Sequence, residues 1–246
     1  MCTAILSIEP GAPVLLAGVR DELADRAWQP PGRHWPDYPG LIGGLDLVAR
    51  RTWLAVSPAQ RRVACVLNGR GRMAPAGSRR SRGVLPLQAA DSGTLARAGL
   101  EDFDPFHLLS AEPGTAALCS WDGEHLTEQK LTAGLHVVVN SGLSIQSAPE
   151  RARIAHFLPR FRAAARPVPE PGSPVAQAWG DWLPLINGDG IPPDDPRALI
   201  VRRDLGNGRV WGTTSISLVA LSPEALRYDF TATPGEPAGW YSITVG

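Results

Sequence analysis

Short apolar runs separated by turns rich in Pro and Gly open the chain. The runs Thr3–Glu9 and Val14–Gly18 are joined by Pro10-Gly11-Ala12-Pro13, which predicts a β-hairpin at the start of the chain. Further runs predict three more short strands, at Leu41–Ala49, Thr52–Ser57 and Arg62–Leu67. Between these groups, Trp28–Pro39 is rich in Pro, Gly and aromatic residues and is expected to be a loop.

The middle of the chain mixes strand and helix patterns. Thr115–Trp121 and His125–Leu131 flank Asp122-Gly123, a strong hairpin turn pair, and Leu135–Asn140 is another strand-like run. Val84–Leu109 lacks strict alternation and is expected to be helical in pieces.

The clearest helix is predicted at Pro149–Ala165. Ser147 and Glu150 fit a capping box, in which the serine accepts from the helix start and the glutamate reaches back. Five apolar residues then recur on one face: Ile154, Phe157, Leu158, Phe161 and Ala165.

The last third of the chain is expected to be mostly β. A second helix at Val175–Ile186 precedes four predicted strands: Leu199–Arg203, Val210–Leu221, Leu226–Thr231 and Trp240–Val245. Strands at both ends with helices between them favour an α+β fold of sheets covered by helices, in one domain spanning residues 1–246.

Composition narrows the function classes. The 246 residues are 43% hydrophobic, and 24 basic side chains balance 24 acidic ones, so no overall field points to nucleic acid. The start has no basic segment followed by a long apolar one, and no apolar run suffices for a membrane span. Three widely spaced cysteines fit neither a disulfide framework nor a zinc site, which favours a cytoplasmic protein with reduced thiols and no metal.

Cys2 is the candidate for chemistry. Methionine is commonly removed before a small residue, and removal of Met1 would place a thiol and a free α-amine on Cys2. An α-amine has a pKa of about 7.7–8.0 and can activate its own nucleophile. The alternative is that Cys2 is an ordinary small residue.

Several segments carry a family resemblance in order along the chain. They are Gly18-Val19-Arg20-Asp21-Glu22, Gly43-Gly44-Leu45-Asp46, Thr52-Trp53-Leu54, Asn68 with Arg70, Ser81-Arg82-Gly83, Phe103–Leu109, Leu135–Asn140 and Trp211–Ser215. This set resembles the NRDE family, also called transport and Golgi organisation protein 2. The chain departs from the family pattern at four places: Val19, Arg50-Arg51, His107 and Thr214.

The resemblance implies the four-layer αββα sandwich of N-terminal-nucleophile hydrolases. The start Met1–Ile5 is also similar to that of amidases that cleave linear amides with an N-terminal cysteine. A small-molecule amide would be the substrate. Because the family is linked to Golgi organisation, lipid metabolism and haem trafficking, a non-catalytic carrier of haem or a lipid-like ligand is the alternative.

Within the hydrolase interpretation, Cys2 would attack the carbonyl carbon. Arg20 would favour the thiolate, and Asp21 would orient the amine or Arg20. Asn68 and Asn140 could donate to the developing oxyanion. Alternatively, the charged residues form a solvated turn, and the asparagines make ordinary strand-end hydrogen bonds.

Other residues are candidates for substrate contacts. The loop 69–82 carries Arg70, Arg72, Arg79, Arg80 and Arg82, which could hold an anionic group or be solvated surface arginines. Trp35 and Trp53 are expected to line the pocket. No cofactor is expected; haem is a possible ligand only, because the five histidines are scattered and no haem-attachment motif is present.

Overall fold

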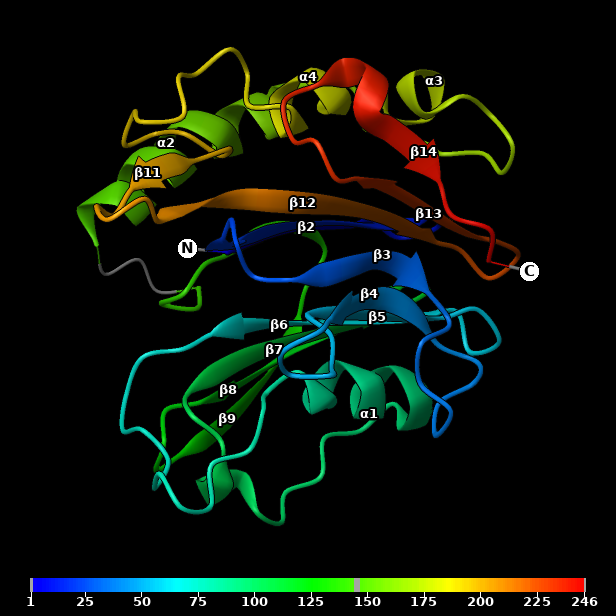
Figure 1. The fold of residues 1–246 in the computed structure, drawn as a ribbon. Helices are drawn as coiled ribbons and strands as arrows, with labels where there is room; N and C mark the ends of the chain where they lie inside the picture. Colours follow the sequence, from blue (N-terminus) through cyan, green and yellow to red (C-terminus); the bar gives the residue numbers. More distant parts are fainter. Residues whose placement is uncertain (1, 144–146, 246) are drawn as a thin grey trace.

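The computed structural model describes residues 2–143 and 147–245, which form two antiparallel sheets packed face to face (Figure 1). The first sheet has the order β10-β1-β2-β12-β13-β14, with β11 paired to β12. Its strands are β1 (Thr3–Ile8), β2 (Val14–Leu23), β10 (Gly134–Val138), β11 (Arg202–Asp204), β12 (Val210–Leu221), β13 (Leu226–Thr231) and β14 (Trp240–Ser242).

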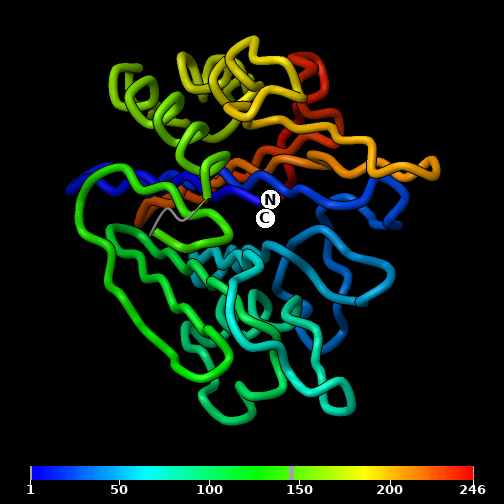
Figure 2. Tube along the Cα trace, turned by 90° about the vertical axis from the view of Figure 1, so that its left-hand side faces the viewer, coloured from blue at the N-terminus to red at the C-terminus, as the bar shows by residue number. Residues whose placement is uncertain are grey.

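The second sheet is a meander in which each strand pairs with the next along the chain. It contains β3 (Trp28–Gly32), β4 (Ile42–Asp46), β5 (Leu54–Ser57), β6 (Arg62–Asn68), β7 (Phe106–Glu112), β8 (Thr115–Trp121) and β9 (Leu126–Leu131). Figure 2 shows the layering from the side, with the blue and orange strands of the first sheet above the cyan and green ones.

The helices lie on the outer faces of the sheets (Figure 1). The second sheet is covered by α1 (Val84–Ser92), and the first by α2 (Ala148–Ala163), α3 (Val175–Trp179) and α4 (Trp182–Ile186). Two short 3-10 helices, η1 (Leu100–Asp102) and η2 (Pro237–Gly239), complete the elements. Within the described ranges, no helix is long and apolar enough to cross a bilayer.

Alternation along the strands decides which side chains fill which layer. In β1, Ala4 and Leu6 belong to the core between the sheets, whereas Ile5 packs in the cluster that contains Phe157 of α2. Because successive side chains point to opposite faces of a strand, the buried strand β1 supplies two cores at once. The same parity directs Cys2 towards the space between the sheets.

The expected four-layer αββα sandwich is wrong. Over the described residues the structure is mainly β, with 14 strands and with 38% strand against 17% helix, so the helices on the outer faces are too few to form full layers. Proline and glycine shorten the helical regions: Val175–Ile186, expected as one helix, is divided at Gly180, where φ is +41°. The residues Phe106–Leu109, expected to be helical, belong instead to strand β7.

Other expectations are confirmed in part. The hairpin at the start forms as β1 and β2, and Ser147 and Glu150 make the capping box of α2. Strand β2 runs on to Leu23, so Arg20, Asp21 and Glu22 lie in a strand and the solvated turn considered for them is wrong. Trp28–Gly32, expected in a loop, forms the edge strand β3.

Candidate functional site

Cys2 lies directly before β1, a strand flanked on both sides by β10 and β2. Thr3 pairs with Val19, so the antiparallel register brings Cys2 beside Arg20. The Cys2 thiol donates to the carbonyl oxygen of Asp21, at 3.6 Å between Sγ and O. The residue is partly buried and lines the cavity beside it.

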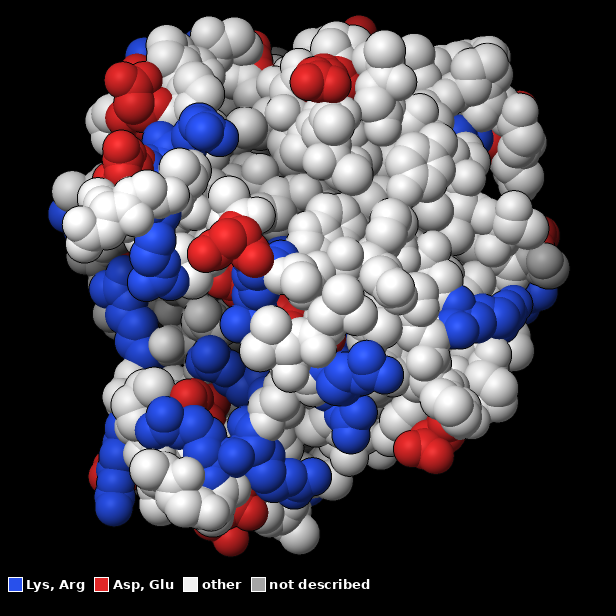
Figure 3. All heavy atoms as spheres, in the orientation of Figure 1, with Lys and Arg blue, Asp and Glu red and all other residues white. Residues whose placement is uncertain are grey.

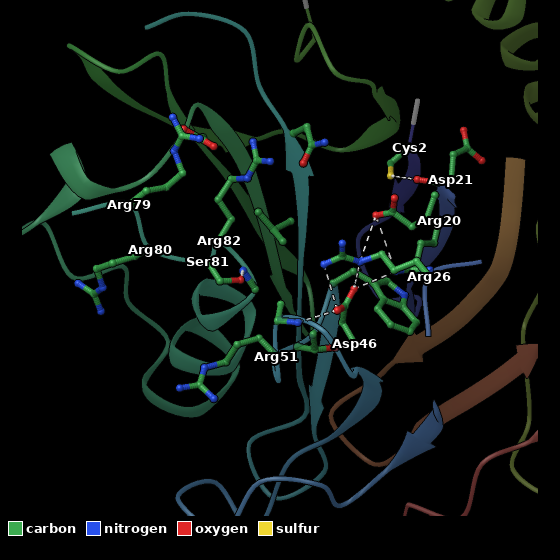
Figure 4. A pocket seen from close by; sticks show the side chains of 18 residues that line it. Cys2, Arg20, Asp21, Arg26, Asp46, Arg51, Arg79, Arg80, Ser81 and Arg82 are labelled. Atoms are coloured by element: carbon green, nitrogen blue, oxygen red, sulfur yellow. Dashed lines mark hydrogen bonds and ion pairs between the residues drawn. The ribbon is translucent and has the colours of Figure 1, made fainter. Parts of the chain in front are cut away.

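A cavity of about 440 Å³ opens next to this thiol. We call its two sides the strand wall, made of Cys2, Arg20, Asp21, Glu22, Arg26 and Asp46, and the loop wall, made of Arg51, Arg79, Arg80, Ser81 and Arg82. Figure 4 shows the labelled residues of the loop wall on the left and those of the strand wall on the right. In Figure 3, basic side chains gather on the left of the face, around a hollow between the two sheets.

A β-bulge helps to place Arg20. In the pairing of β12 with β2, Thr213 lies opposite Asp21 and Ser215 opposite Arg20, which leaves Thr214 as the extra residue. The bulge directs Thr214 towards Arg20, whose Nη1 donates to Oγ1 of Thr214 at 2.8 Å. The sequence departure at Thr214 therefore contributes a contact to the strand wall.

Arg20 is 5% exposed, and its charge is balanced inside the strand wall. Its Nη2 lies 3.1 Å from Oδ2 of Asp46 and 3.9 Å from Oε2 of Glu22. Arg26 binds the same carboxylate of Asp46 at 2.6 Å. The Arg20 guanidinium also lies over the ring of Trp53, with its carbon 4.4 Å from the ring centroid, in cation–π geometry.

Glycine makes room for Trp53. A Cβ on Gly44 would come within 2.2 Å of the Trp53 ring, and a Cβ on Gly43 within 2.3 Å of the Leu54 carbonyl oxygen. Gly44 therefore makes room for the indole that packs beneath Arg20, whereas Gly43 allows the close approach of β5. Trp53 also meets Trp28 edge to face, with 5.8 Å between the ring centroids.

Asp21 is held by residues beneath the strand wall. Its Oδ1 accepts from the Thr213 hydroxyl at 2.6 Å. Burial raises the pKa of the Asp21 carboxyl, and the Arg153 guanidinium acts in the opposite direction. Arg153, on α2, is itself buried and donates to Oγ1 of Thr3 at 2.8 Å, which ties the helix to the start of β1.

The Cys2 thiol is not activated by its surroundings alone. Burial raises its pKa, the Asp21 carboxylate raises it further, and the opposing effect of Arg20 is smaller. Because Asp46 and Glu22 neutralise Arg20, the cation gives less help to the thiolate than its position suggests. Burial also raises the pKa of Cys65 to about 12 and that of Cys119 to about 11.

The loop wall depends on a close backbone contact. A Cβ on Gly83 would lie 2.7 Å from Cβ of Arg51, so only glycine lets this loop pack against the turn before β5. Arg82 donates from Nη1 to the Pro105 carbonyl oxygen at 2.7 Å, and Arg79 pairs with Asp104 at 3.1 Å. Arg80 lies over the Phe103 ring at 4.8 Å.

The predicted residues divide into two groups. Six of them line the cavity: Cys2, Arg20, Asp21, Asn68, Trp53 and Arg82. The other three lie elsewhere. Asn140 donates its Nδ2 to the Asn68 carbonyl oxygen at 2.9 Å, Arg70 pairs with the buried Glu150 at 3.2 Å, and Trp35 is buried in the cluster beneath α1.

Several lining or supporting residues were missed by sequence reasoning. Asp46 was noted only as part of a motif, yet a buried arginine needs an anionic partner, and this aspartate ends a strand as Asn68 does. Arg51 was noted only as a departure from the family. Nothing in the helical pattern around Arg153 marks it as buried beneath the site.

No group of three or more His, Cys, Asp and Glu side chains in residues 2–143 and 147–245 is placed to hold a metal ion. Arginine side chains of the loop wall provide groups for binding an anion, and the thiol provides a nucleophile. No protein-family model matches the chain. A search of curated proteins also found no match.

Proposed function

We propose that the chain is an N-terminal-nucleophile hydrolase that cleaves a linear amide with Cys2 after Met1 has been removed. Met1 lies outside the described residues, so its removal stays a prediction. The observation that carries the proposal is the position of Cys2 at the head of an internal strand, on a cavity that Arg20, Asp21 and Asn68 also line.

The raised pKa of Cys2 requires a base, and the α-amine of the same residue is the nearest available one in the processed chain. The amine would take the thiol proton as the sulfur bonds to the carbonyl carbon. It would return that proton to the departing nitrogen as the C–N bond breaks. Water would then cleave the thioester, losing a proton to the same amine and releasing the acid and the thiol.

One residue of the strand wall, one at the end of β6 and one that follows β10 would support these steps. Asp21 lies beside Cys2 and would orient the α-ammonium group that forms during attack. The Asn68 side chain lines the cavity and would donate to the carbonyl oxygen as negative charge develops on it. Asn140 would act indirectly, since its amide already binds the Asn68 carbonyl.

The state of the cysteines and the family resemblance both belong to this proposal. The three cysteines are all free thiols, which suits the reducing cytoplasm that we propose as the location. The resemblance to the NRDE family is likewise part of the proposal. Carriage of haem or a lipid-like ligand is less well supported, because the cavity is lined by charged side chains and, within the described residues, by no histidine.

The test is hydrolysis of a panel of N-acyl p-nitroanilides and p-nitrophenyl esters. Cys2→Ala should lower kcat/KM by at least about a thousandfold, as expected for loss of a nucleophile. Cys119→Ala is the matched control, because this partly exposed thiol lies on β8 away from the cavity. Equal turnover by wild type and Cys2→Ala would reject the hydrolase.

A further inference from the structure

The two walls of the cavity differ in how their charges are balanced. Six arginines and four acidic residues line the cavity. The carboxylates of Asp46 and Glu22 serve Arg20 and Arg26, and Asp104 serves Arg79. In the part of the chain that the structure describes, the other three arginines form no ion pair: Arg51, Arg80 and Arg82.

Their place on one cavity sets these three arginines apart, because other described arginines, such as Arg33, Arg61 and Arg209, also form no ion pair. Exposed arginines on neighbouring surface do pair with acids: Arg72 lies 3.4 Å from Glu124, and Arg97 lies 2.8 Å from Glu128. Partners are thus available around the loop wall. Arg51, Arg80 and Arg82, which have none among the described residues, lie on one side of one cavity, opposite the Cys2 thiol (Figure 4).

Arg82 is the central member of this group. It is half-buried, and its single hydrogen bond to described residues fixes Nη1 on the Pro105 carbonyl, which leaves Nε and Nη2 for a ligand. Figure 4 shows its side chain extending from the loop towards the middle of the cavity. Burial lowers the pKa of this guanidinium, so an anion beside it would offset the desolvation.

The hollow continues past Arg51 and Arg80. A second cavity of about 310 Å³ shares Ala49, Arg51, Arg80 and Ser81 with the first and adds Arg50. Arg51 and Arg80 therefore border both spaces. A ligand that places a carbonyl at Cys2 has room for a charged group on the far side of the loop wall.

We propose that the loop wall is an anion subsite, in which Arg82 binds a carboxylate or phosphate group of the substrate and Arg51 and Arg80 add positive charge at the edge of the cavity. This subsite rests on the proposed function, and it implies that the substrate is a linear amide with an anionic group remote from the scissile bond. The guanidinium fork suits both anions, because it can donate two parallel N–H bonds to either. The paired arginines of the strand wall take no part in this binding.

Calorimetric titration of the wild-type chain at low salt tests the subsite directly, with glutarate as the carboxylate probe and inorganic phosphate as the phosphate probe. At least one probe should bind, and Arg82→Gln should weaken it by about tenfold or more, the usual effect of losing a charged hydrogen-bond donor. Arg51→Gln should weaken it less. Arg72→Gln is the matched control, since this exposed arginine of the same loop lines neither cavity, and it should bind like wild type. Thermal melts of each variant establish that it is folded.

Binding of neither probe, or equal binding by Arg82→Gln and Arg72→Gln, would overturn the subsite.

A hydrolysis assay distinguishes failure of the subsite from failure of the proposed hydrolase. It compares N-glutaryl and N-pentanoyl p-nitroanilide as a charged and a neutral substrate. The subsite predicts a preference for the charged substrate that Arg82→Gln removes. If neither anilide is cleaved while glutarate binding still depends on Arg82, the subsite stands and the hydrolase falls. If both are cleaved equally well by wild type and Arg82→Gln, the hydrolase stands and the subsite falls.

Discussion

The strand wall and the loop wall differ in how each stabilises the positive charge of its arginine side chains. Arg20, in the strand wall, is almost completely buried, and Asp46, Glu22 and Thr214 surround its guanidinium. Arg82, in the loop wall, keeps part of its surface in water and needs only one carbonyl partner. A charge buried in a sheet needs an opposite charge or hydrogen bonds within the fold, whereas a half-exposed charge can remain available to a ligand.

The largest expected effect follows from removing the shared carboxylate of the strand wall. Asp46→Asn would leave the buried Arg20 without its closest anionic partner, and loss of one partner of a buried pair costs about 3–5 kcal/mol. Urea unfolding of wild type and variant measures this difference.

The matched control is Glu124→Gln, which removes the partner of an exposed arginine. That variant should lose no more than about 1 kcal/mol, because exposed ion pairs contribute little. Similar losses in the two variants would show that the strand wall is no more dependent on its ion pairs than ordinary surface is.

Acid should reduce the stability that the Asp46 carboxylate contributes to the strand wall. Burial opposes ionisation of Asp46, but hydrogen bonds from Arg26 and the backbone of Ala49 outweigh it, so the pKa lies below the ordinary value. The resulting stabilisation is complete above the unfolded pKa of about 3.9 and is lost as pH falls through the lower, folded pKa. Unfolding curves measured between neutral pH and pH of about 3 should therefore show that the difference in free energy of unfolding between wild type and Asp46→Asn becomes smaller as the pH falls. A difference that stays constant would contradict this assignment.

The thiol at the strand wall should respond to its acidic neighbour. Because the Asp21 carboxylate raises the pKa of Cys2, Asp21→Asn should lower it and increase the thiolate fraction at neutral pH. The rate of alkylation by iodoacetamide, followed against pH, should move to lower pH in the variant. Asp104→Asn, which alters the opposite side of the cavity, is the control; an unchanged profile in Asp21→Asn would remove Asp21 from the account of this thiol.

The smallest expected effect lies in the loop wall. Arg51→Gln should change the free energy of unfolding by less than about 0.5 kcal/mol, since this exposed arginine has no ion pair within the described residues. Urea unfolding beside Asp46→Asn makes the contrast between the walls quantitative. A loss comparable to that of Asp46→Asn would mean that the loop wall is structural.

Local patterns in the sequence were enough to predict much of the secondary structure. The hairpin of β1 and β2 follows from its turn residues, and the capping box of α2 follows from Ser147 and Glu150. The balance of strand and helix did not follow, because Phe106–Leu109 has no strict alternation yet pairs on both sides within the second sheet. Pairing with distant strands overrides such local ambiguity.

The site was predictable where neighbours in the sequence become neighbours in the sheet. Cys2, Arg20 and Asp21 meet because a hairpin brings its two ends together. Asp46, Thr214 and Arg153 reach the site from other strands and from α2, across separations that no local pattern encodes. Trp35 was expected in the cavity but is buried beneath α1, since aromatic composition does not specify which core a side chain joins.

Intact mass spectrometry with peptide mapping, after brief exposure to an activated acyl ester, tests the central claim most directly. The account predicts a chain lacking Met1 and carrying one acyl group on Cys2, with Cys65 and Cys119 unmodified because their pKa values are raised and neither residue has an α-amine to accept the thiol proton. A folded chain that retains Met1, or that takes up the acyl group on another cysteine, would contradict the assignment of Cys2 as the nucleophile.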